Sequence, residues 1–403
     1  MAVRRVVITG LGIISPIGIG KEAFYEGLFK GVSGIKPITL FDTFAYKVKT
    51  AGEVTEFSAE SFLGAKGLRT LDRSTRLVSS ATKLALDDAN IQISEGNARD
   101  IAVSVGSTLG SIKSISDFDR EALTEGSRYV NPALFPNTVI NSAASQVSIR
   151  FNIRGFNATI SSGFSASLDA INYAADFLRL GRIKIVLAGG VEELCEQLFI
   201  AFYKTGCLAG VKDASAELSC PFDLRRNGII LGEGSVILAL EDLDSALSRG
   251  AKIYAQIKGF STGLDKKKGL IRAMQGALKK SQLSPSDIDL ICAGANSSQE
   301  GDREEARAIK DVFEKDAERV YISAIKSLTG EQYSNSGALQ AAAAVAAIEK
   351  EMIPPTVNYQ ERDAACDLRI VTEAHRSKVK NVLINAYGKG GCSSSLVISK
   401  FEG

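Results

Sequence analysis

The segment around Phe164 has the layout of a nucleophile site but carries no nucleophile at its centre. Residues 159–167 lead into apolar side chains at helical spacing, and residues 182–190 are typical of a buried strand that ends in a turn. Backbone N–H groups and the helix dipole at such a helix start stabilise an anion, so a cysteine there would be a reactive thiolate. Phenylalanine can neither ionise nor attack a carbonyl. The segment therefore predicts a catalytic elbow that has lost its chemistry.

Other side chains near this elbow could act as nucleophiles only with a group to activate them. Ser162 and Ser165 flank the elbow, and the pairing of a serine with Lys326 is one alternative that stays open. Cys392, just after a Gly-Gly turn, is another candidate thiol. The single histidine of the chain, His375, lies in a charged stretch that is typical of the surface. Chemistry that needs two histidines is therefore excluded for this chain alone.

The composition is that of a balanced α/β protein. The 403 residues are 45% hydrophobic and include 48 basic and 46 acidic side chains, which are spread along the chain and argue against a nucleic-acid partner. The six cysteines form no C-x-x-C pair, as is typical of reduced cytoplasmic thiols, and we expect no metal site. No apolar run approaches the ~20 residues of a membrane span, and we expect no signal peptide because the N-terminus enters a strand directly. We therefore expect a cytoplasmic protein without a membrane span.

Strand and helix patterns alternate in both halves of the chain. In the first half we expect strands at 5–9, 101–106 and 183–188, and a glycine turn that leads into a buried strand within 228–240. We expect helices at 21–29, 71–90 and after the elbow, and an irregular stretch before the elbow. In the second half we expect strands at 253–259, 288–293, 320–322, 379–386 and 394–400, and helices at 269–282, 302–313 and 338–352. This alternation predicts a layered α/β fold. The similar order of the halves suggests a duplicated core, divided into residues 1–245 and 246–403.

The glycines of Gly10-Leu11-Gly12 follow the first predicted strand and could indicate a dinucleotide site. A third glycine is missing, and no acidic residue follows a second strand at the usual distance. We interpret this segment as a tight exit from the strand.

Several short segments together carry a sharper identity. They are VITGLG (7–12), FDT (41–43), LDR (71–73), PFD (221–223), RNG (226–228), GEG (232–234), GD (301–302), KSLTG (326–330) and GKGG (388–391). In this order the segments resemble the elongating β-ketoacyl-[acyl carrier protein] synthases of the thiolase-like superfamily, over nearly the full length. The resemblance implies an α/β fold of five layers, αβαβα, built from two duplicated halves and usually present as an obligate dimer.

Members of that family act through one cysteine, which takes the acyl chain, and two histidines, which promote decarboxylation and stabilise the enolate. The resemblance places the cysteine position at Phe164 and the two histidine positions at Gly294 and Glu331, so all three groups are lost. A supporting lysine of the family is retained as Lys326. Because Glu331 would lie among basic groups, we expect it to contact Lys326 or Lys389.

Other positions relate to the substrate arm and the carrier protein. Lys389 takes the place of the phenylalanine that gates the family's active site. Asn296 and Ser298 correspond to the threonines that hold the phosphopantetheine arm of the acyl carrier protein, and we expect no other cofactor. Lys66 and Arg69 fall where basic residues receive the acidic carrier in relatives.

The resemblance implies a non-condensing subunit similar to a chain-length factor. Such a subunit pairs with a catalytic ketosynthase homologue in a heterodimeric β-ketoacyl-ACP synthase of fatty-acid, polyketide or polyene biosynthesis, and we expect this chain to be inactive alone. The sequence departs from that pattern because such partners often carry glutamine where Phe164 stands. One alternative is an acyltransferase or decarboxylase that acts through Lys326, Glu331 or Cys392. Another is a homodimer that binds the acyl carrier without turnover.

Overall fold

The computed structural model describes residues 4–212 and 217–403. Its strands are β1 (Val6–Ser15), β2 (Gly18–Ile19), β3 (Ile35–Pro37), β4 (Thr50–Gly52), β5 (Ile101–Gly106), β6 (Asn157–Ile160), β7 (Ile185–Glu192), β8 (Gly234–Asp242), β9 (Ala255–Leu264), β10 (Leu290–Cys292), β11 (Tyr321–Ser323), β12 (Met352–Ile353), β13 (His375–Arg376), β14 (Asn381–Tyr387) and β15 (Cys392–Ser399). Its α-helices are α1 (Lys21–Lys30), α2 (Glu60–Leu63), α3 (Arg73–Asp88), α4 (Ile112–Thr124), α5 (Ser142–Phe151), α6 (Ala166–Arg179), α7 (Glu196–Lys204), α8 (Leu243–Ser248), α9 (Gly269–Ser281), α10 (Gln299–Phe313), α11 (Lys326–Thr329) and α12 (Ser336–Lys350).

One large mixed sheet organises the described residues. Ten strands follow the order β11-β10-β14-β15-β9-β1-β8-β7-β5-β6, and β2 adds to β1. The two halves of the chain meet at β1, which pairs antiparallel with β8 on one side and with β9 on the other. The strands of the C-terminal half therefore lie on one side of β1, and the other long strands of the N-terminal half lie on its other side.

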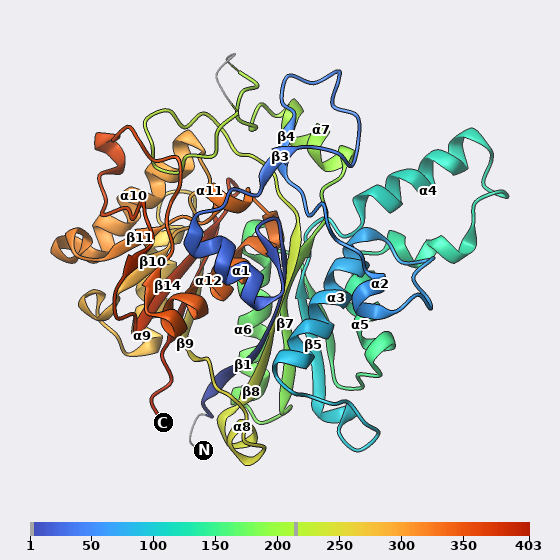
Figure 1. Cartoon of the computed structure of the whole chain (residues 1–403), viewed down its shortest axis with the longest axis horizontal. Helices are drawn as coiled ribbons and strands as arrows, with labels where there is room; N and C mark the ends of the chain where they lie inside the picture. Colours follow the sequence, from blue (N-terminus) through green and yellow to red (C-terminus); the bar gives the residue numbers. More distant parts are fainter. Residues whose placement is uncertain (1–3, 213–216) are drawn as a thin grey trace.

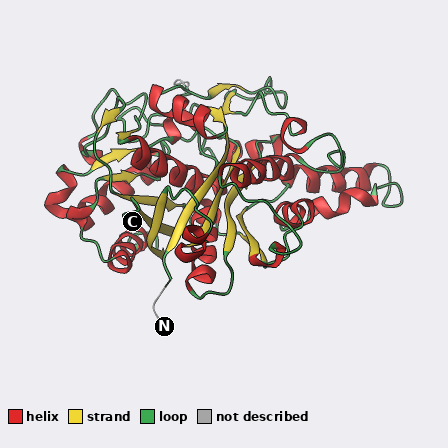
Figure 2. Ribbon diagram, turned by 60° about the horizontal axis from the view of Figure 1, so that its bottom comes forward, coloured by secondary structure: helices red, strands yellow, loops and turns green. Residues whose placement is uncertain are grey.

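Helices cover the outer sides of the strands in both halves, and a further helical layer lies between the strands of the two halves (Figure 1). Helices α3 and α5 lie outside the N-terminal strands, α9 and α10 lie outside the C-terminal strands, and α6 and α12 pack between them. Figure 2 shows the same strands running through the body with helices on either side. This arrangement confirms the expected thiolase-like fold of five layers.

The strands are apolar on both faces because each face meets a layer of helices. In β7, Val186 and Ala188 join the central core with α6 and α12, whereas Ile185 and Leu187 join the outer core with α3. The alanines of α12 are all buried, and their small side chains allow a close approach to the neighbouring layers. A Cβ atom on Gly337 would lie 2.6 Å from Cγ of Leu168, so α12 touches α6 directly.

Two expectations about the N-terminal half are wrong. Gly10 and Gly12 lie in the middle of β1 and do not form its exit. A Cβ atom on Gly12 would come within 1.8 Å of the carbonyl oxygen of Ala81, so these glycines allow α3 to pack on the strand. The stretch before the elbow is also not irregular, because it contains α4 and α5. None of the residues of α4 is fully buried in the described chain.

The arm is the segment 112–140, which contains α4 and the short 3₁₀ segment Pro132–Thr138. It projects from the body beside α2 and α3 (Figure 1). Among residues 4–212 and 217–403, the arm included, no helix is long and apolar enough to cross a membrane.

Candidate functional site

The elbow before α6 is occupied by an aromatic ring. A 3₁₀ turn, Gly163–Ser165, connects the end of β6 to α6, and Gly163 has the positive φ of +71° that glycine adopts readily. The half-buried ring of Phe164 meets the ring of Tyr333 edge-on, with centroids 4.5 Å apart. Tyr333 in turn meets Phe202 of α7, with centroids 5.7 Å apart. These three rings form an aromatic row across the position where a thiol would need open space for a substrate.

Phe164 also contacts the turn that follows β14. A Cβ atom on Gly388 would lie 2.8 Å from Cδ2 of Phe164, so only glycine fits against the ring. The tertiary structure therefore brings the elbow and the Gly388–Gly391 turn together, and a gate role of Lys389 stays a prediction.

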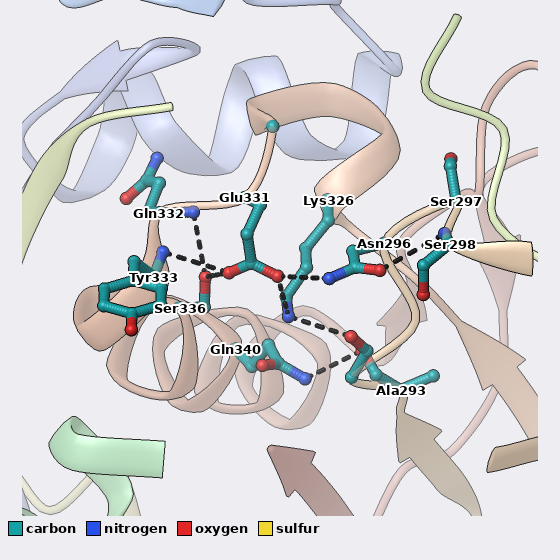
Figure 3. Close-up of polar contacts among 12 residues, drawn as sticks. Ala293, Asn296, Ser297, Ser298, Lys326, Glu331, Gln332, Tyr333, Ser336 and Gln340 are labelled. Atoms are coloured by element: carbon teal, nitrogen blue, oxygen red, sulfur yellow. Dashed lines mark hydrogen bonds and ion pairs between the residues drawn. The ribbon is translucent and has the colours of Figure 1, made fainter. Parts of the chain in front are cut away.

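Glu331 and Lys326 form a buried ion pair (Figure 3). The Lys326 Nζ lies 2.8 Å from Oε2 of Glu331, and both side chains are at most 3% exposed. The same Nζ donates to the carbonyl oxygen of Gly294 at 2.8 Å. The contact expected between Glu331 and Lys326 is thus confirmed.

Both oxygens of the Glu331 carboxylate have further donors. Oε2 accepts from the side-chain amide of Asn296 at 2.8 Å. Oε1 accepts from the backbone N–H of Tyr333 at 3.0 Å and from the hydroxyl of Ser336. Because a buried charge is tolerated only when it is paired and hydrogen-bonded, this set holds Glu331 in place as a structural anion.

The position of Gly294 is closed by a neighbouring ring. A Cβ atom here would lie 2.8 Å from Cε1 of Tyr387 and 2.9 Å from the carbonyl oxygen of Asn385. The backbone N–H of Gly294 donates to Oε1 of Glu305 at 3.0 Å. Burial, followed by the neighbouring Glu305 charge, raises the pKa of Tyr387 well above its usual range, so its hydroxyl stays protonated. A larger side chain at 294 would have to displace this packing.

The two residues proposed for the phosphopantetheine arm have different surroundings. The buried Asn296 amide donates to Glu331, and its Oδ1 accepts from the backbone N–H of Ser298 at 3.3 Å. Ser298 is half-buried. Asn296 therefore serves the ion pair, a role that the sequence did not indicate.

Lys389 does not join the ion pair. Its exposed Nζ lies 3.1 Å from Sγ of Cys207 instead. The expectation that Lys389 could share a buried cluster with Glu331 is thus wrong, because its turn directs the amine toward the loop after α7.

A hydroxyl cluster lies under the elbow. Asp169 of α6 accepts from Ser162, from Ser165 at 3.1 Å and from Ser394 at 2.6 Å. The Sγ of Cys392 lies 3.4 Å from Oγ of Ser165. The alternative pairing of a serine with Lys326 has no support, because the Lys326 amine faces Glu331 and the carbonyl of Gly294.

Lys66 and Arg69 are exposed on the loop between α2 and α3. Arg69 lines a pocket of about 420 Å³ together with Arg73 and Arg76. Arg73 is partly neutralised by Glu233, whose carboxylate lies 2.5 Å away. The loop thus offers positive charge at the surface, and carrier docking there stays a prediction.

In residues 4–212 and 217–403, no group of three or more His, Cys, Asp or Glu side chains is placed so that it could hold a metal ion.

The fold and the elbow define a ketosynthase-like protein. The chain belongs to the β-ketoacyl synthase family, since residues 3–246 match the N-terminal domain model of that family and residues 251–360 match the C-terminal domain model. The 3-oxoacyl-[acyl-carrier-protein] synthase 2 of Coxiella burnetii is 34% identical, with 99% of both chains covered. The family resemblance inferred from the motifs is thus confirmed.

Solved structures agree with this assignment. A chain of the ishigamide ketosynthase/chain length factor superposes with a TM-score of 0.92 at 31% identity and covers 100% of both chains. A chain from a type II PKS acyl-carrier protein in complex with its ketosynthase superposes with a TM-score of 0.89 at 29% identity, covering 99% of this chain and 100% of the other.

Proposed function

We propose that this chain is the non-condensing, chain-length-factor-like subunit of a heterodimeric β-ketoacyl-ACP synthase. The observation that carries the proposal is the ion pair between Glu331 and Lys326, next to an elbow that holds Phe164. Condensation needs a thiolate to carry the acyl chain and donors for the enolate oxygen. The described site offers a ring at the first position and an anion at the second, and an anion would repel the developing negative charge.

The partner surface in this proposal is the open edge of the sheet together with the arm. β6 is the last strand of the sheet and has a neighbour on one side only among the described strands. Large apolar side chains of the arm are exposed, namely Leu123, Tyr129, Leu134, Phe135, Val139 and Ile140. An unpaired edge beside exposed apolar groups is prone to association, so we propose that the catalytic homologue covers it.

The carrier protein is the second proposed partner. An acidic carrier would meet Lys66 and Arg69, and its phosphopantetheine arm would reach Ser298 and Asn296. A known structure with this fold contains a type II PKS acyl-carrier protein with its ketosynthase, which supports the proposal by analogy. Lys389 would stand at the gate of this path.

The alternatives have less support from the site. An acyltransferase or decarboxylase that acts through Lys326 or Glu331 would have to break their buried pair first. A homodimer that binds acyl carrier would use the same open edge, so the composition of the purified complex separates it from the heterodimer.

The test is co-expression with a homologue that retains the cysteine and both histidines, encoded next to this chain. Native mass spectrometry should show a one-to-one heterodimer that elongates acyl-carrier substrates. This chain alone should release no CO₂ from malonyl-carrier above the level of a heat-denatured sample. The proposal is wrong if the isolated chain extends an acyl group, or if the two proteins form no complex.

A further inference from the structure

Cys207 lies in an electropositive, partly exposed setting. It follows α7 in the chain and is half-buried. The Nζ of Lys389, 182 positions away in the sequence, lies 3.1 Å from its sulfur. The hydroxyl of Thr205 donates to the same sulfur at 3.1 Å. The charge of Lys212 also acts on the thiol. One ammonium group and one hydroxyl therefore lie within hydrogen-bond distance of this half-buried thiol, and the charge of a second lysine also acts on it.

These groups favour the thiolate form of Cys207. Burial by itself raises the pKa of the Cys207 thiol, but the hydrogen bonds from Thr205 and Lys389 and the charges of Lys389 and Lys212 outweigh it and lower the pKa below its usual value. Burial instead raises the pKa of Cys195, Cys220 and Cys292 to about 12 and that of Cys366 to about 11. Since the thiolate is the nucleophile, Cys207 is chemically distinct from these four.

Cys207 also lies at one end of the aromatic row. Its backbone N–H donates to the carbonyl oxygen of Phe202 at 3.2 Å. The Phe202 ring contacts Tyr333, which contacts Phe164 at the elbow. Lys389 comes from the turn whose Gly388 packs on Phe164. Both members of the Cys207–Lys389 pair thus lie on segments that contact the aromatic row at the elbow.

We propose that Cys207 is an acyl-accepting thiol, with Lys389 as the residue that positions it. The thiolate attacks the carbonyl carbon of a pantetheine-type thioester and forms a new S–C bond. The bond from that carbon to the pantetheine sulfur breaks, and the released thiolate takes a proton from solvent. No oxidant or reductant is needed. The chain would then hold an acyl group without elongating it, because the elbow lacks the groups for condensation.

This inference goes beyond the proposed function and rests on it only for the source of the thioester. The probe is S-octanoyl-N-acetylcysteamine, a small pantetheine-like thioester, used on the full chain at pH 7. Peptide mass spectrometry should find a hydroxylamine-sensitive octanoyl group on the Cys207 peptide. The group should be absent from Cys207→Ser and present in the matched control Cys392→Ser.

The role of Lys389 has its own readout. Lys389→Met should slow alkylation of Cys207 by iodoacetamide roughly tenfold at pH 7 and move the midpoint of the rate against pH upward, because the Lys389 hydrogen bond and charge that stabilise the thiolate are lost. Lys389→Arg keeps the charge and should retain most of the rate. Circular dichroism checks that each variant is folded.

Two results would overturn the inference: no octanoyl group on Cys207, or a Lys389→Met variant that reacts as fast as the parent. Both measurements use the isolated chain. They can therefore fail while the heterodimer still forms, and the heterodimer can fail while Cys207 is still acylated, so the two proposals are judged separately.

Discussion

At the scale of single residues, Glu331 and Gly294, the two proposed histidine positions, lie in tightly packed, buried surroundings. Glu331 is paired with Lys326, hydrogen-bonded to Asn296 and supported by the N–H of Tyr333. The ring of Tyr387 occupies the space in which a side chain at position 294 would lie. In a low-dielectric interior such a network is stabilising only when every member is satisfied. A change at one residue should therefore disturb the others.

Glu331→Gln should strongly destabilise the chain. The variant leaves the Lys326 ammonium buried without a counter-charge, which costs about 3–5 kcal/mol of unfolding free energy. The double variant Lys326→Met/Glu331→Gln should lose less than the sum of the two single changes, because it removes both charges. Urea unfolding at pH 7 measures these values.

The control for that experiment is the exposed pair Glu26–Lys30, whose side chains are both 65% exposed. Glu26→Gln should leave the unfolding free energy nearly unchanged because solvent screens this pair. A Glu331→Gln variant as stable as the parent would show that the buried pair does not hold the site together.

At the scale of elements, the arm is the segment whose apolar side chains stay largely exposed in the isolated chain. An amphipathic helix gains most of its stability by packing its apolar face. No residue of α4 is buried within the described chain, and Leu123 near its end is 87% exposed. The arm extends away from the sheet in both views (Figures 1 and 2). Such an element is expected to pack against another subunit.

Leu123→Asp and Ile140→Asp should weaken the proposed heterodimer. Each variant places a charge at an apolar contact of the arm, where desolvation without a partner is unfavourable. The stability of the isolated chain should change little, since both side chains are already exposed. Native mass spectrometry of the co-expressed pair gives the fraction of heterodimer.

Leu247→Asp is the matched control for the arm. This leucine is 56% exposed on α8, outside the arm, and its replacement should leave the heterodimer intact. Unchanged heterodimer in both arm variants would exclude the arm from the interface.

At the scale of the whole molecule, the layered core buries carboxyl groups that prefer to be protonated. Burial raises the pKa of Glu192 from 4.5 to about 8, although Ser334 and the backbone of Thr108 donate hydrogen bonds to it. Burial likewise raises the pKa of Glu193 and Glu305 to about 7 and that of Asp302 to about 6. The folded chain therefore holds protons that the unfolded chain has released near neutral pH.

The free energy of unfolding should fall as the pH rises. For an acid with a raised pKa in the folded state, the stabilisation is complete below its unfolded pKa and is lost as the pH approaches the folded pKa. For Glu192 this window runs from about 4.5 to about 8. One such group gives a slope of up to about 1.4 kcal/mol per pH unit.

Glu192→Gln should make this slope shallower, because glutamine does not titrate. Urea unfolding at several pH values across the window compares the variant with the parent. Glu26→Gln, an exposed change, should keep the parental slope. Parallel curves for Glu192→Gln and the parent would contradict a protonated Glu192 in the folded chain.

The whole fold was largely predictable from the chain. Period-two and helical patterns depend on neighbours in the sequence, which is why β5 lies at the expected residues 101–106 and α9 ends within one residue of its expected end. The division into residues 1–245 and 246–403 stays a prediction. The helix of the arm, α4, was not predicted, and none of its residues is fully buried in the described chain.

The sequence by itself identified the family through the resemblance of its motifs, and that resemblance implied the five-layer fold. The same resemblance predicts that Phe164, Gly294 and Glu331 stand where the family has its thiol and both imidazoles. Only the tertiary structure decided which lysine pairs with Glu331, that Tyr387 closes the space beside Gly294, and that Lys389 meets Cys207. These contacts join segments far apart in the chain. Their partners are selected by the packing of layers and the direction of each turn, which no local pattern encodes.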